Sequence, residues 1–108
     1  MTTVSLQAPR NVGTRDLVRA WLGSATPEDL AGRVVLVDCA DLLTPTPSFL
    51  DEMIKMLVLE RSADTVRVTN ASERTALYAN RSAANRQVSD RVHVTERAGR
   101  RRLLNRVS

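Results

Sequence analysis

Three hydroxyl side chains lie in one short proline-containing segment and have the clearest capacity for chemistry in this sequence. Thr44, Thr46 and Ser48 alternate with Pro45 and Pro47, directly before a helical pattern of apolar residues. A phosphate at the start of a helix meets the positive end of the helix dipole and adds about two negative charges to the surface. We therefore predict a switch loop with Ser48, Thr46 and Thr44 as candidate phosphoacceptors, and helix capping is the alternative role for the same hydroxyls.

The cap of this helix has two alternatives. Ser48 followed by Asp51 resembles a capping box with a carboxylate, whereas Thr46 followed by Pro47 supplies a cap and a proline at the first helical position. Further along, Asp51 and Lys55 have the i, i+4 spacing of a favourable ion pair. Asp51, Glu52 and Lys55 are expected on the wetter side of the helix.

Two acidic residues follow an apolar run at 34–37, where open α/β sheets place their ligands. Asp38 and Asp41 could in principle hold Mg²⁺, and the alternative is that they are solvated loop acids that cap turns. Because no third acidic ligand is suitably spaced, we predict no metal site. The two aspartates join Asp51, Glu52 and Lys55 as a candidate surface for a protein partner.

Other catalytic or cofactor-binding patterns have little support. His93 is the only histidine and Cys39 the only cysteine, so a zinc cage of thiolates and imidazoles is excluded. We expect His93 at an exposed strand position and Cys39 in the core. The four glycines form no phosphate-binding motif. The sequence therefore predicts a protein without a cofactor and without enzymatic activity.

The net charge of +4 comes from the end of the sequence. From Arg91 onward there are six arginines and one glutamate, while the preceding residues are close to neutral. The alternative function is nucleic-acid binding through this segment, but only three aromatic residues are available for base stacking, so nucleic acid is not the expected partner. The arginines concerned are Arg97, Arg100, Arg101, Arg102 and Arg106.

Strand and helix patterns alternate along the sequence and predict an α/β fold. Residues 34–37 form an uninterrupted β-branched and apolar run, which is typical of a central strand covered on both faces or nearly so. We expect a mixed, mostly parallel sheet of four or five strands packed against helices in a single domain, 1–94, followed by a basic tail, 95–108. Strands are expected at 3–6, 34–37, 65–69 and 92–94, and helices at 14–23, from 48 onward and at 72–84.

Two helices carry apolar rows that are expected to be buried. Phe49, Met53 and Leu57 form one row of the helix that follows the proline segment, and Leu50, Ile54 and Val58 form the adjacent row. In the first helix the expected buried stripe comprises Leu17, Val18, Trp21 and Leu22. A helical turn capped by Thr26 is expected after it.

The apolar runs are far shorter than the roughly 20 residues that cross a bilayer, and the first residues lack the pattern of a signal peptide. We expect no membrane association and a cytoplasmic location. Pairing of an exposed edge strand across a homodimer is a further expectation that the sequence leaves open.

Four segments together resemble the STAS-like family of small bacterial proteins. They are residues 33–38, 46–52 and 65–70, with the Gly-Thr-Arg element at 13–15. The resemblance covers about residues 3–86, and its most specific piece is the Ser-Phe-Leu-Asp-Glu run that starts at Ser48.

STAS-like proteins are similar in outline to the STAS domains of anti-sigma-factor antagonists. In those domains a serine or threonine at the corresponding helix start is phosphorylated by a partner kinase. The resemblance implies a non-enzymatic regulatory module that switches partners, one of them a histidine-kinase-like ATPase. The antagonists' Asp-Ser-Ser-Gly type of motif is replaced by Thr46-Pro47-Ser48-Phe49, which leaves Ser48 as the first candidate acceptor and Thr46 as the second.

Overall fold

Strands and helices alternate along residues 2–97, the part of the chain that this computed structural model describes. The sheet has the order β1-β2-β3-β4, and every neighbouring pair is parallel. The predicted α/β fold is therefore confirmed, and its four strands are all parallel. The elements are β1 (Thr3–Gln7), α1 (Arg15–Ala25), β2 (Val34–Asp38), α2 (Pro47–Ile54), the π-helix η1 (Lys55–Glu60), β3 (Thr65–Ala71), α3 (Glu73–Asn85), the 3₁₀-helix η2 (Ser89–Arg91) and β4 (Val92–Glu96).

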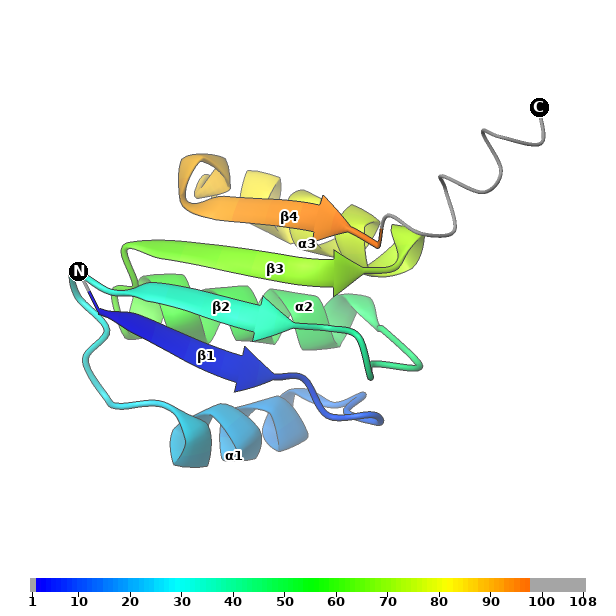
Figure 1. Cartoon of the computed structure of the whole chain (residues 1–108), viewed down its shortest axis with the longest axis horizontal. Coiled ribbons are helices and arrows are strands. Elements are labelled where there is room, and N and C mark those ends of the chain that lie inside the picture. The colour runs from blue at the N-terminus through cyan, green and yellow to red at the C-terminus, as the bar shows by residue number, and fades with distance from the viewer. Residues whose placement is uncertain (1, 98–108) are drawn as a thin grey trace.

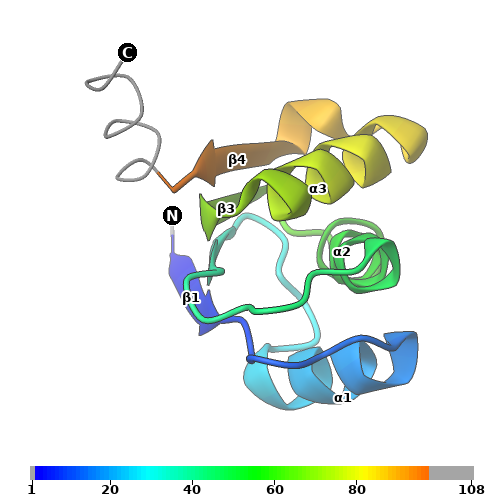
Figure 2. The same ribbon diagram turned by 90° about the vertical axis from the view of Figure 1, so that its right-hand side faces the viewer.

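The three α-helices within residues 2–97 cover the same face of the sheet, as Figures 1 and 2 show. In β2 the side chains of Val35 and Val37 are fully buried, whereas Val34 and Leu36 are only half-buried. The expectation that this strand is covered on both faces or nearly so is met on one face only, because each crossover within residues 2–97 passes on the same side of the sheet. Leu36 instead faces the side of the sheet that no helix of residues 2–97 covers, in register with Ser5 and Arg67 of its two neighbours.

The core centres on α2, the middle helix of the layer. The two predicted apolar rows run from α2 into η1 and are confirmed, since Phe49, Leu50, Met53, Ile54 and Leu57 are all fully buried and Val58 is nearly so. The ring of Phe49 stacks on Trp21 of α1, with 5.9 Å between the ring centroids. This contact joins the middle of α1 to the first turn of α2.

Helix α1 buries a narrower stripe than the sequence predicts. Val18 and Leu22 are buried, but Leu17 is 53% exposed because α1 flanks the layer and packs against α2 alone among the α-helices. The helix also continues past the predicted end at residue 23 to Ala25. Thr26 does not cap a new helical turn; its hydroxyl donates to the carbonyl of Leu22, and α1 ends there because Thr26, the residue before Pro27, has an extended backbone.

The ordered fold continues beyond the predicted domain boundary at residue 94. Strand β4 extends to Glu96, and the N–H of Arg97 donates to the carbonyl of Ala71 at 2.9 Å. Within the described part of the chain, no helix is both long and apolar enough to span a bilayer.

Candidate functional site

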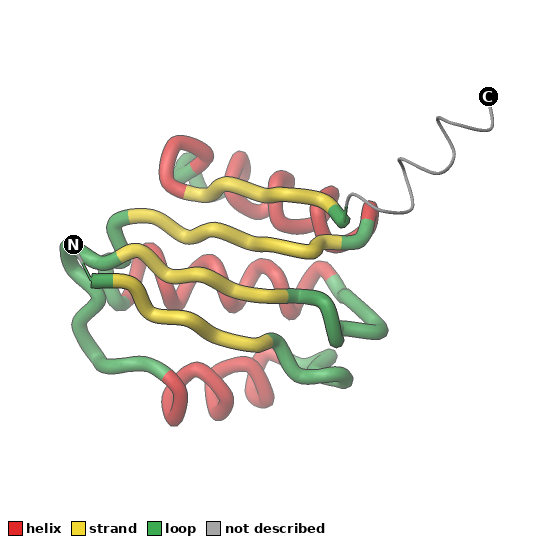
Figure 3. Tube along the Cα trace, in the orientation of Figure 1, coloured by secondary structure: helices red, strands yellow, loops and turns green. Residues whose placement is uncertain are grey.

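The loops that leave β1 and β2 lie side by side at the carboxyl edge of the sheet (Figure 3). The N–H of Leu43 donates to the carbonyl of Arg10 at 3.1 Å, and the hydroxyl of Thr46 donates to the carbonyl of Gly13 at 3.3 Å. Thr44, which lies in sequence between the two residues that form these hydrogen bonds, is exposed, and the neighbouring Leu43 is 63% exposed. The predicted switch loop is therefore fixed to the first loop while it presents an apolar and a hydroxyl side chain to solvent.

Thr46, rather than Ser48, caps α2. Its hydroxyl accepts a hydrogen bond from the N–H of Phe49 at 3.0 Å, and its backbone is extended, with φ −124° and ψ 154°. Proline disfavours a helical conformation in the residue before it, so the helix begins at Pro47. Ser48 becomes the second helical residue, and its half-buried hydroxyl forms no hydrogen bond with any residue between 2 and 97.

Removing each hydroxyl in turn tests this assignment. Thr46→Ala is expected to lower the free energy of unfolding by about 1 kcal/mol, because the N–H of Phe49 loses its acceptor. Ser48→Ala is expected to change it by no more than about 0.5 kcal/mol. Denaturant unfolding of the two variants measures both values, and a larger loss in Ser48→Ala than in Thr46→Ala would refute the assignment.

Asp51 ties α2 to both neighbouring helices. Its carboxylate accepts two hydrogen bonds from Arg86, from Nε and Nη2 at 2.8 Å each, and one from the buried Ser82 hydroxyl at 2.7 Å. Arg15 of α1 adds a fourth at 2.9 Å. The Arg86 guanidinium, above all, holds the pKa of Asp51 well below its usual range, so this carboxylate is charged throughout the physiological range.

Glu52 is buried in the same interface, contrary to the expectation that it faces water. Its carboxylate is 3% exposed and accepts from Arg15 at 3.0 Å and from Arg19 at 2.8 Å. Burial acts to raise the pKa of Glu52, but the hydrogen bonds from Arg19 and Arg15 outweigh burial and lower it. Sequence reasoning misplaced Glu52 because helix periodicity alone does not show that α1 lies against this face.

The predicted ion pair between Asp51 and Lys55 is absent from the described residues. Asp51 is already held by Arg86, and the Lys55 ammonium lies 3.9 Å from the Glu60 carboxylate. Glu60 also accepts two hydrogen bonds from Arg19. Contacts between helices have replaced the local pair that sequence spacing favoured.

Asp38 and Asp41 belong to a different cluster, at the end of β2. Asp38 accepts from the side-chain amide of Asn70 and from the N–H of Ala40, both at 2.9 Å, while Asp41 accepts from Gln7 at 2.9 Å. The hydrogen bonds from Asn70 and Ala40 lower the pKa of Asp38. Residues 2–97 contain no group of three or more side chains arranged to hold a metal ion.

The predicted partner surface therefore divides into two clusters. Asp38 and Asp41 lie with the loops at the carboxyl edge of the sheet, whereas Asp51, Glu52 and Lys55 take part in contacts of the helix layer. Asp38 and Asp41 adjoin the predicted switch loop from the strand side, and Asp51 lies one helical turn beyond Ser48 on α2.

The remaining predicted residues have mixed outcomes. Cys39 is buried, as predicted, and burial raises the pKa of its thiol to about 12, so the thiolate is scarce at neutral pH. His93 is exposed on β4, also as predicted. The Arg97 guanidinium donates to the carbonyls of Ala40 and Asn70 at 3.3 and 3.4 Å. The other arginines of the predicted basic tail, Arg100, Arg101, Arg102 and Arg106, lie outside the described residues.

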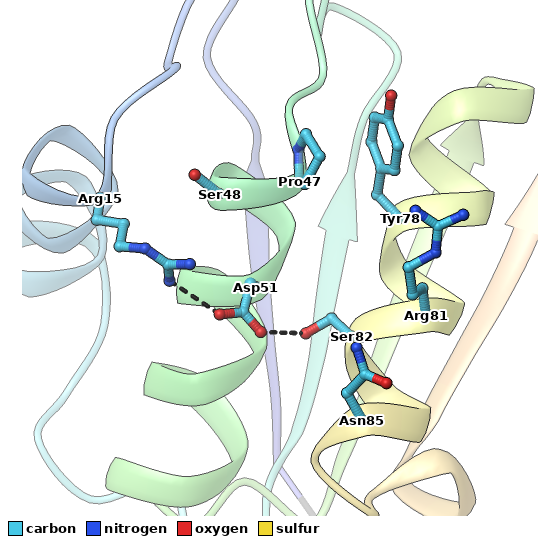
Figure 4. A pocket seen from close by; sticks show the side chains of 8 residues that line it. All are labelled: Arg15, Pro47, Ser48, Asp51, Tyr78, Arg81, Ser82 and Asn85. Carbon is cyan, nitrogen blue, oxygen red and sulfur yellow. Dashed lines mark hydrogen bonds and ion pairs between the residues drawn. The ribbon is translucent and has the colours of Figure 1, made fainter.

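A pocket of about 240 Å³ over the first turns of α2 was not found by sequence reasoning. Figure 4 shows Ser48 and Arg15 on one side of α2, and Tyr78 and Arg81 of α3 on the other. The spacing of Tyr78, Arg81 and Asn85 on one face of α3 was the available signal, but it does not show which helix that face meets.

Comparison with protein-family models, curated proteins and solved structures finds no match for this chain. The resemblance to STAS-like proteins therefore stays a prediction from the residue pattern.

Proposed function

We propose that this chain is a non-enzymatic, STAS-like regulatory module that binds a protein partner through the segment 43–48 and adjoining residues. The observation that carries this proposal is the exposed Leu43 on a loop held by hydrogen bonds. An exposed apolar side chain on a fixed loop can enter a partner's pocket with little loss of backbone entropy. The partner we propose is a histidine-kinase-like ATPase, as the resemblance implies.

Ser48 is the proposed switch residue of this surface. Thr46 is committed to the cap, so a phosphate on its hydroxyl would disturb the start of α2. Ser48 has an uncommitted hydroxyl in the first turn, where a phosphate would be favoured by the helix dipole and would add about two negative charges beside the loop. In the proposed switch, the unmodified surface binds the partner and the modified surface does not.

A charge placed at Ser48 is expected to weaken partner binding without unfolding the protein. Ser48→Asp should reduce the binding free energy by about 1 kcal/mol or more, a common scale for a disrupted interface contact. Wild type, Ser48→Asp and the control Ser89→Asp are used as baits in cell extract, and mass spectrometry identifies partners and modified residues. Ser89 is exposed before β4, at the opposite edge of the sheet, so it matches the change in charge away from the loop.

We expect wild type and Ser89→Asp to recover an ATPase or kinase-like protein that is depleted with Ser48→Asp. We also expect part of the wild-type protein to carry phosphate on Ser48. Equal recovery by all three folded baits, with an unmodified loop, would contradict the switch. Unfolding curves of the baits show whether each one is folded.

A further inference from the structure

The pocket over α2 has positive side chains on two sides. Arg15 reaches it from the first turn of α1, and Arg81 from α3 (Figure 4). Arg81 is exposed and makes no ion pair or hydrogen bond within residues 2–97. Arg15 uses one of its terminal nitrogens for Asp51 and Glu52, and 48% of its side chain is exposed. Both guanidinium groups therefore retain N–H donors for a ligand.

The acidic residue in this pocket does not cancel that charge. Both oxygens of Asp51 accept hydrogen bonds from Arg86, and Ser82 and Arg15 bond to them as well. Arg86 balances the charge of Asp51. The positive charge of Arg81 and part of that of Arg15, which also pairs with Glu52, therefore remain around the pocket. A pocket with this balance favours an anionic ligand.

The other lining groups add donors and an apolar wall. The Ser48 hydroxyl, the Tyr78 hydroxyl and the Asn85 amide line the pocket and form no side-chain hydrogen bonds within the described chain. Figure 4 shows the Tyr78 ring beside Pro47, which gives two rigid apolar surfaces on the α3 side. Polar groups from seven of the eight lining residues surround these apolar surfaces and can orient a small ligand against them.

We propose that this pocket binds a phosphomonoester carried on a small, flat apolar group. The phosphate would contact the guanidinium groups of Arg15 and Arg81, and the apolar group would pack on Tyr78 and Pro47. Arginine suits this ligand because its planar N–H groups match phosphate oxygens. The proposal does not depend on the partner proposed above, since it needs only the pocket itself.

Phenyl phosphate is the probe, titrated into ¹⁵N-labelled full-length protein at constant ionic strength, with inorganic phosphate in parallel. We expect saturable amide shifts concentrated around Ser48, Tyr78 and Asn85, with phenyl phosphate binding more tightly than inorganic phosphate. Arg81→Gln should weaken phenyl phosphate at least fivefold. Arg74→Gln is the matched control, because Arg74 is also exposed on α3 but does not line the pocket.

Equal affinities in the two variants, or shifts scattered over the surface, would overturn the pocket assignment. Equal binding of phenyl phosphate and inorganic phosphate would overturn the role of Tyr78 and Pro47. A short phosphotyrosine peptide then separates the two sources of such a group: tighter binding than phenyl phosphate indicates a modified protein, and weaker binding a free small molecule. The bait experiment with Ser48→Asp can fail without affecting any of these results.

Discussion

Phe49→Ala is expected to lower the free energy of unfolding by about 3–5 kcal/mol, the usual cost of removing a fully buried aromatic ring. Phe49 has no exposed surface and stacks on Trp21, so alanine would leave a cavity between α1 and α2. Domains of this size have a total stability of about 5–15 kcal/mol, so the variant would keep only part of it.

Thermal and urea unfolding followed by circular dichroism measure this loss. Fluorescence is not used, because the signal of Trp21 would respond directly to the missing ring. Leu77→Ala is the control: Leu77 is 50% exposed on α3, and its truncation should cost less than about 1 kcal/mol. Similar losses in the two variants would contradict the placement of Phe49 at the centre of the core.

Asp51→Ala is expected to lower the free energy of unfolding by about 2–3 kcal/mol at neutral pH. The substitution leaves the buried Ser82 hydroxyl and the Arg86 guanidinium without their acceptor, and hydrogen bonds to charged groups have this scale. Asp64→Ala removes the same charge from a carboxylate that has no side-chain partner in residues 2–97, and should cost less than about 0.5 kcal/mol.

The effect of Asp51→Ala should also depend on pH. The pKa of Asp51 is lower in the folded protein than in the unfolded chain, so the folded state is stabilised above the unfolded pKa, and this contribution is lost as pH falls through the folded pKa. The stabilities of wild type and Asp51→Ala should therefore converge as the pH is lowered from about 5 to about 2. Urea unfolding at a series of pH values measures this, and a constant difference between the two proteins would refute the role of the charged Asp51.

These two predictions bear on the candidate site because the same contacts position it. Phe49 holds the first turn of α2 in the core by stacking on Trp21 of α1. Asp51 holds the same part of α2 through its hydrogen bonds from Arg15 and Arg86. Ser48 lies in that turn and lines the pocket. The loop and the pocket are therefore supported by the core and by the ion-pair cluster of the helix layer.

The cap of α2 shows which contacts can be predicted from residues close in sequence and which cannot. The sequence predicted a cap by either Ser48 or Thr46. The rule that a residue before proline avoids the helical region favours Thr46. The tie from Thr46 to Gly13 joins residues 33 positions apart, and no local pattern predicts it. The open face of the sheet had a local signal too, because polar Thr3, Ser5 and Gln7 alternate along β1 with residues that face the helices.

By itself, the sequence determined the order of the strands and α-helices, the apolar rows that begin in α2 and the buried place of Cys39, since these follow from residue spacing and hydrophobicity within each element. Only the tertiary structure decided that the three α-helices of the described chain cover one face, that Glu52 is buried, and that Asp51 binds Arg86 rather than Lys55. Those outcomes depend on which helices become neighbours. Charged side chains select partners among groups that folding brings within about 3 Å, and separation along the chain does not encode that proximity.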